Sequence, residues 1–218
     1  MKYRFLLAII ISPFFCNSQS ITDSVQLHTL LFNNFIGGSV LLKSGQVEQA
    51  MLNYNTDNQN IVFIKDGQYL ALSDLEAIDT IYIDDKKFVP VKKAFYEVLT
   101  PELSVPLFVS YSNKISPLIA TVDHNGNSKQ SGSTVSNTIS DTYLNRTFKG
   151  RYNVQFRIQY WIKKGYTLHK ANNEKHFTNL FPQKKWDIHT FIAENQINFE
   201  NRFDIVRLAE FCNTLNKK

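Results

Sequence analysis

Cysteine is scarce in this chain, and its scarcity excludes a disulfide framework. The 218 residues include only Cys16 and Cys212. We expect Cys16 to be removed with an N-terminal targeting segment, so Cys212 would have no partner for an internal bridge. The mature chain must therefore be held together by its own core, which a chain of about 200 residues can bury.

The sequence also lacks the common catalytic and metal-binding motifs. It contains no G-x-S-x-G, H-E-x-x-H, C-x-x-C or phosphate-binding loop, and its five histidines are dispersed. We therefore expect no cofactor and no metal, and we assign no catalytic residue. The formal charge of +5 is spread along the chain, which does not favour nucleic acid as a partner.

The N-terminus has the pattern of a secretory signal peptide. Lys2 and Arg4 precede the apolar run 5–11, which is shorter than the roughly 20 residues of a membrane-spanning helix. We predict cleavage after Ser18, which leaves Gln19 as the first mature residue and places the protein in the periplasm or outside the cell. No later hydrophobic run is long enough to span a bilayer, so we expect no transmembrane helix in the mature chain.

Lipid anchoring at Cys16 is the alternative processing route. A lipidated Cys follows a small residue in bacterial lipoprotein signals, whereas Phe15 precedes Cys16 here. We therefore favour cleavage near Ser18.

Residues 19–122 are rich in predicted strands and form the first region of the mature chain. Apolar runs alternate with the turn signals Ser44-Gly45, Asp66-Gly67 and Asp84-Asp85. Closely spaced strands joined by tight turns indicate an antiparallel sheet, either rolled or sandwiched.

Residues 123–142 are dominated by Ser, Thr, Asn and Gly and carry little apolar surface. We interpret them as a flexible loop or linker, and a binding loop is the alternative.

Residues 143–218 combine a β-hairpin with short helices. Val154, Phe156, Ile158, Tyr160 and Ile162 alternate with polar residues, and Lys164-Gly165 marks a turn. Asn173 and Asn201 are expected helix N-caps, and Pro182 should separate the first two helices. Cys212 lies on the apolar stripe of the last helix, which predicts a buried thiol. The predicted fold class is α+β, a β-rich N-terminal region followed by a hairpin and helix module.

Parts of the sequence resemble cell-envelope proteins of the Bacteroidota. The C-terminal segment shares with them Leu180-Phe181-Pro182, Lys184-Lys185, Phe191-Ile192 and Glu194-Asn195, and departs from their pattern at Trp186, His189 and Cys212. The strand-rich stretch 50–91 is similar to a region of the same kind of protein. This resemblance implies an envelope location and a shared architecture, but no activity and no functional residue.

Three aromatic residues are candidates for a contact surface. Trp161 falls on the polar phase of its strand, and Tyr143 and Tyr160 lie nearby in the sequence. Together they could contact a protein or a glycan, although packing under the helices would explain an aromatic there equally well.

These observations favour a non-enzymatic binding or scaffold protein of the cell envelope whose partner is another envelope protein. One alternative is an exported hydrolase with a site assembled from distant Asp, Glu and His residues. The other is a binder of a glycan or small molecule.

The processing prediction is tested by mass spectrometry of the mature N-terminus after expression in a bacterial host. We expect a chain that starts at Gln19. A lipid-modified Cys16 would contradict the predicted cleavage and would place the protein on a membrane.

Overall fold

The computed structural model describes residues 24–117, 145–149 and 152–215. Several sequence predictions fall outside these ranges: the signal peptide with its cleavage after Ser18, the lipidation alternative at Cys16, the linker 123–142, and Tyr143. They remain predictions.

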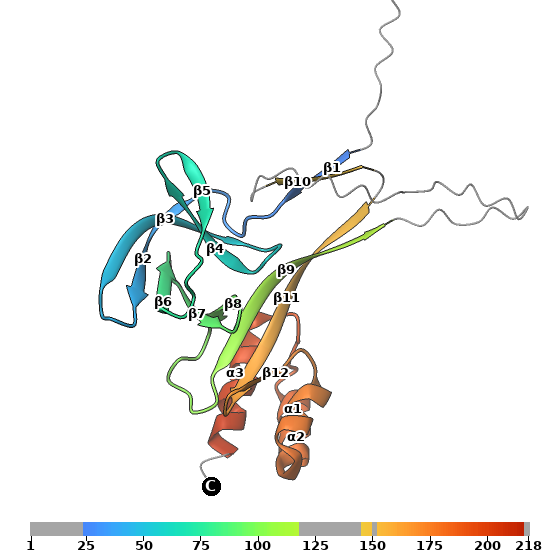
Figure 1. Ribbon diagram of the computed structural model, residues 1–218. Coiled ribbons are helices and arrows are strands. Elements are labelled where there is room, and N and C mark those ends of the chain that lie inside the picture. The colour runs from blue at the N-terminus through green and yellow to red at the C-terminus, as the bar shows by residue number, and fades with distance from the viewer. Residues whose placement is uncertain (1–23, 118–144, 150–151, 216–218) are drawn as a thin grey trace, which may run out of the picture.

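An antiparallel sheet of ten strands forms most of the described structure (Figure 1). Its order is β12-β11-β9-β8-β7-β6-β2-β3-β4-β5. The strands are β2 (Ile36–Leu42), β3 (Val47–Asn55), β4 (Asn60–Lys65), β5 (Gln68–Ala71), β6 (Ile78–Ile83), β7 (Lys86–Val91), β8 (Ala94–Val98), β9 (Leu107–Pro117), β11 (Tyr152–Lys164) and β12 (Thr167–Lys170). A separate pair consists of β1 (Ser24–His28) and β10 (Asn145–Lys149).

Three helices follow the sheet and lie against one end of β9, β11 and β12 (Figure 1). They are α1 (Glu174–Leu180), α2 (Lys185–Glu194) and α3 (Arg202–Leu215), with a 3₁₀ turn (Pro182–Lys184) before α2. The α+β fold class predicted from the sequence is therefore confirmed. None of the helices in the described ranges has the length and apolar character that crossing a bilayer requires.

The helix boundaries follow from side chains that satisfy free backbone groups. The Asn173 carboxamide accepts the N–H of His176 at 3.0 Å, and that of Asn201 accepts the N–H of Phe203 at 2.9 Å. Pro182 begins the 3₁₀ turn, where its missing N–H costs nothing. Both predicted caps and the predicted break are confirmed.

The tight turns lie where the sequence predicted them and use residues with positive φ. Gly45 ends the β2–β3 turn at φ +89°, and Asp66-Gly67 joins β4 to β5 with φ values of +52° and +73°. Asp84 and Gly165 serve the β6–β7 and β11–β12 turns. The strands are thus ordered mostly by local hairpins.

The sheet is rolled, so that the β3–β4 turn meets β8 and β9. The N–H of Phe95 donates to the carbonyl of Gln59 at 2.8 Å, and the N–H of Asn113 donates to that of Thr56 at 3.3 Å. Tyr54 fills the interior of the roll, with its ring 5.5 Å from Phe88. Burial raises the pKa of the Tyr54 hydroxyl, which lies within hydrogen-bond distance of two backbone carbonyls.

Close packing of strands β2 and β6 requires a glycine at position 38. A Cβ there would lie 2.3 Å from the Tyr82 carbonyl oxygen and 3.0 Å from a methyl group of Leu52. At the neighbouring Gly37, a Cβ would meet nothing within 4 Å. The two adjacent glycines therefore differ in what they tolerate.

We expect Gly38→Ala to lower the free energy of unfolding by about 1–3 kcal/mol, because the added methyl overpacks the strand pair. Gly37→Ala, the matched control, should change it by at most about 0.5 kcal/mol. Urea denaturation of both variants measures the difference. Equal stability of the two would contradict the close approach at Gly38.

Candidate functional site

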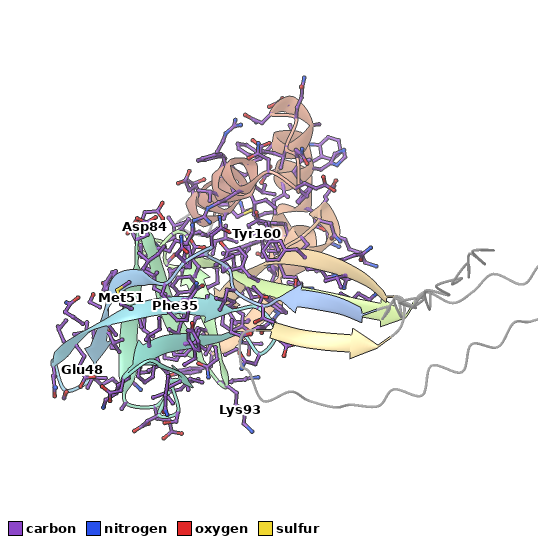
Figure 2. All side chains as sticks on the ribbon, turned by 90° about the horizontal axis from the view of Figure 1, so that it is seen from above. Phe35, Glu48, Met51, Asp84, Lys93 and Tyr160 are labelled. Carbon is purple, nitrogen blue, oxygen red and sulfur yellow. The ribbon has the colours of Figure 1, made fainter. Side chains whose placement is uncertain are left out.

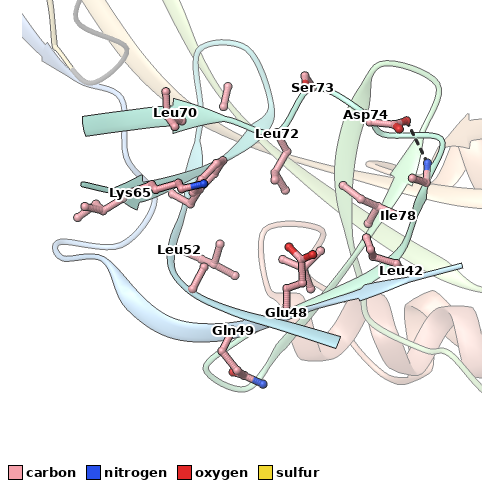
Figure 3. Close-up of a pocket in the computed structure, with 16 residues that line it drawn as sticks. Leu42, Glu48, Gln49, Leu52, Lys65, Leu70, Leu72, Ser73, Asp74 and Ile78 are labelled. Atoms are coloured by element: carbon pink, nitrogen blue, oxygen red, sulfur yellow. Dashed lines mark hydrogen bonds between the residues drawn. The ribbon is translucent and has the colours of Figure 1, made fainter. Parts of the chain in front are cut away.

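An open, mostly apolar hollow lies on the face of the sheet formed by β2 to β6. Its volume is about 670 Å³, within the usual range for small-molecule sites. Figure 3 shows the lining side chains converging from two hairpins and from the segment that leads into β6. The apolar part of the lining consists mainly of Leu42, Leu52, Phe63, Leu70, Leu72 and Ile78.

Strand register explains why these side chains meet. Leu52 pairs with Phe63, which pairs with Leu70, so all three point to the same face of the sheet. Ala50, two residues before Leu52, shares that face and contributes only a methyl group. The small side chain leaves space that a larger residue would fill.

Charged residues stand at the mouth of the hollow. Glu48, Lys65 and Asp74 are exposed, and all three belong to the lining. Asp74 also closes the turn before β6, because its carboxylate accepts the N–H of Ala77 at 3.2 Å (Figure 3). A group that enters the hollow would therefore meet an apolar floor and a rim that carries both signs of charge.

The lining is better equipped for binding than for proton transfer. It contains no histidine, and its two carboxylates, Glu48 and Asp74, are exposed at the rim. General acid–base catalysis needs an acid or base held within hydrogen-bond reach of the reacting group.

The structure does not place Tyr160 and Trp161, two of the three predicted contact residues, on one face of the sheet. Tyr160 is only 4% exposed and faces the helices (Figure 2), whereas Trp161, as its neighbour in a strand, points to the opposite face. Trp161 is half-buried, lies edge-on to Tyr96 and donates from Nε1 to Ser110 Oγ at 2.9 Å. Tyr160 is thus unavailable for an outside partner, and Tyr143 lies outside the described residues.

Trp161 does line a second, shallower hollow of about 510 Å³ between β12 and α1. His169 and His176 also belong to its lining. His176 Nδ1 accepts the N–H of Asn172, and its pKa is lowered by burial and by Lys170 and Lys175. The two histidines lack a third ligand, since no group of three metal-ligating side chains occurs among the residues described.

A buried carboxylate that the sequence analysis did not identify joins the sheet to the helices. The Glu97 side chain on β8 is 2% exposed and forms an ion pair with Arg202 at the start of α3. Lys86 lies 3.4 Å from the same carboxylate, and the Tyr111 hydroxyl donates to it. The sequence does carry one sign of this burial. Glu97 lies two residues after the buried Phe95, so both side chains point to the same face of β8.

Two groups that contact Glu97 have raised pKa values. Burial disfavours the charged form of Arg202, but hydrogen bonding and attraction from Glu97 outweigh this effect and raise the pKa of the guanidinium. Burial and the Glu97 charge both raise the pKa of Tyr111. Arg202 and Tyr111 thus both keep their protons at neutral pH.

The thiol of Cys212 is buried on α3, as the sequence predicted. Burial raises its pKa to about 12, so the thiolate form is absent at neutral pH. This is the environment of a packing residue.

Comparison with known proteins adds no identification. No protein-family model matches the chain, and no curated protein or solved structure is significantly similar to it. The resemblance to envelope proteins therefore remains a prediction.

We expect Arg202→Met to lower the free energy of unfolding by about 2–3 kcal/mol, because it leaves Glu97 buried without its main counter-charge. Arg207→Met on the same helix removes an exposed pair with Asp204 and an exposed hydrogen bond to Asn195, and should cost at most about 1 kcal/mol. Adding Glu97→Gln to Arg202→Met should recover part of the loss. Similar stabilities for the Arg202 and Arg207 variants would contradict an anchoring role for Glu97.

Proposed function

We propose that the protein is an exported, non-enzymatic binding protein of a bacterial cell envelope that holds an apolar group of its ligand in the hollow between β2 and β6. The observation that carries this proposal is the hollow itself, about 670 Å³ in volume with a largely apolar lining. Export and the envelope location rest on the signal-peptide pattern and the family resemblance. Another envelope protein remains the proposed partner.

The chemistry of the lining favours an apolar or amphipathic ligand. Burial of apolar surface supplies about 25 cal/mol per Å², so the leucine-rich floor would provide most of the affinity. The exposed Glu48, Lys65 and Asp74 at the mouth would contact a polar end of the ligand and set its orientation.

The alternatives have weaker support in the geometry. A hydrolase requires a positioned acid or base, whereas the lining of the hollow contains no histidine and only the exposed carboxylates Glu48 and Asp74. A glycan-binding role would use the second hollow, where Trp161 and Lys164 lie together. There Trp161 is half-buried and its indole N–H is already paired with Ser110, which favours the apolar hollow as the primary site.

The test uses the neutral apolar fluorophore N-phenyl-1-naphthylamine as the probe. We expect saturable binding that Ala50→Phe weakens about tenfold or more, a loss of about 1.4 kcal/mol, because the ring occupies the hollow. The measurement is a fluorescence titration of the purified protein.

Met51→Phe is the matched control, because Met51 lies on the same strand, points to the opposite face and is exposed. It should bind the probe as the parent chain does. Equal binding by the Ala50 and Met51 variants, at unchanged thermal stability, would exclude the hollow as the site.

A further inference from the structure

The outer edge of β11 is open along much of its length. On one side β11 pairs with β9 from Tyr152 to Ile162, but on the other side β12 pairs only with Trp161 to Lys164. In the described parts of the chain, no strand pairs with this outer side between Val154 and Gln159. The sheet's other edge strand, β5, has only four residues.

The backbone groups of this edge that no described strand pairs with point outward. At Tyr160 the carbonyl accepts the N–H of Ala171 at 2.9 Å, and the N–H donates to Asn172 Oδ1 at 2.7 Å, so both groups face the β12 side. Because these directions alternate along a strand, the N–H and C=O groups of Val154, Phe156 and Ile158 face the same side. They can accept one further strand.

Apolar side chains flank the open edge on the face that the helices cover elsewhere. Phe156 and Ile158 are 53% and 47% exposed, although Tyr160 in the same row is buried. Phe156 stacks on Tyr111 at 6.1 Å, which fixes its ring beside the edge. An exposed edge bordered by apolar residues is a known site of strand addition.

The opposite face of the same edge is basic. Arg157 lies on it, and Lys114 of β9 shares it through the pairing of Lys114 with Gln155. Lys163 and Lys170 continue the face toward β12, and the described residues of β9, β11 and β12 place no Asp or Glu on it.

We propose that the open edge of β11 binds an extended peptide segment of a partner protein in which apolar and acidic residues alternate. The peptide adds as an antiparallel strand, the orientation of every pair in this sheet. Its apolar residues pack on Phe156 and Ile158, and its acidic residues face Arg157 and Lys114.

A second copy of the chain fits this edge poorly. Antiparallel pairing of two β11 strands would bring two Arg157 side chains onto one face with no acid between them. Charge complementarity therefore favours a separate acidic peptide over self-association.

The test measures fluorescence anisotropy with a labelled seven-residue peptide, Val-Glu-Val-Glu-Val-Glu-Val, added to the purified protein. In an antiparallel pair, residues opposite Phe156 and Ile158 direct their N–H groups to the edge. N-methylation of the Val residues should therefore abolish binding, whereas N-methylation of the Glu residues should leave it intact. Equal effects of the two modifications, or no binding of the parent peptide, would overturn the proposal.

Charge reversal provides a second, independent readout. We expect Arg157→Glu to weaken binding of the Val/Glu peptide about fivefold or more and to strengthen binding of the matching Val/Lys peptide. Ala50→Phe, which fills the separate hollow, should leave peptide binding unchanged, so this proposal and the proposed function can fail independently.

Two other occupants of the edge would count against the proposal. Concentration-dependent dimerisation that Ile158→Lys abolishes would assign the edge to a second copy. Peptide binding that appears only after residues 1–23 are removed would assign it to that segment of the chain itself.

Discussion

A carboxylate can be buried only where positive charge and hydrogen-bond donors compensate it, and Glu97 imposes this requirement on the molecule. Arg202 supplies the charge from the first turn of α3, and Tyr111 supplies a hydroxyl from β9. The N-terminal end of α3 is thereby fixed over the sheet, and near its other end Asn213 accepts the N–H of Val105 and donates to its carbonyl. Residues of α1 and α2 share one buried cluster with Tyr160 and Ile162. An apolar residue at position 97 would remove the directional contact at the start of α3, since apolar contact is not directional.

The local parts of the fold could be predicted from the sequence, because each depends on a few neighbouring residues. Asp66-Gly67 requires positive φ at both positions, and Asn173 caps its helix with its own side chain. The sequence predicted a rolled or a sandwiched sheet without deciding between them, and the pairing of β2 with β6 could not be predicted, because it joins segments that no local pattern relates. Glu97 and Arg202 are 105 residues apart in the sequence. The one sign of their pairing in the sequence is an acidic residue at a strand position whose neighbour two residues earlier, Phe95, is buried.

The candidate sites could also be predicted only in part from the sequence. Leu52, Phe63 and Leu70 read individually as core residues, and only the strand register reveals that they surround a space beside Ala50. Trp161 lies on the polar phase of its strand, as predicted. Tyr160 is its neighbour in the strand, so its side chain points to the opposite face of the sheet, where it is buried. The exposure of Phe156 depends on where the helices stop, which is a property of the tertiary structure alone.

The long separation between Glu97 and Arg202 has a consequence for biosynthesis. The strands up to β9 are joined mostly by short hairpins, so they can pair soon after they leave the ribosome. At about 5–20 residues per second, the 105 residues from Glu97 to Arg202 take roughly 5–20 s to synthesise. Until Arg202 has been synthesised, Glu97 lacks its main counter-charge, so α3 can dock on this carboxylate only after the earlier strands are complete.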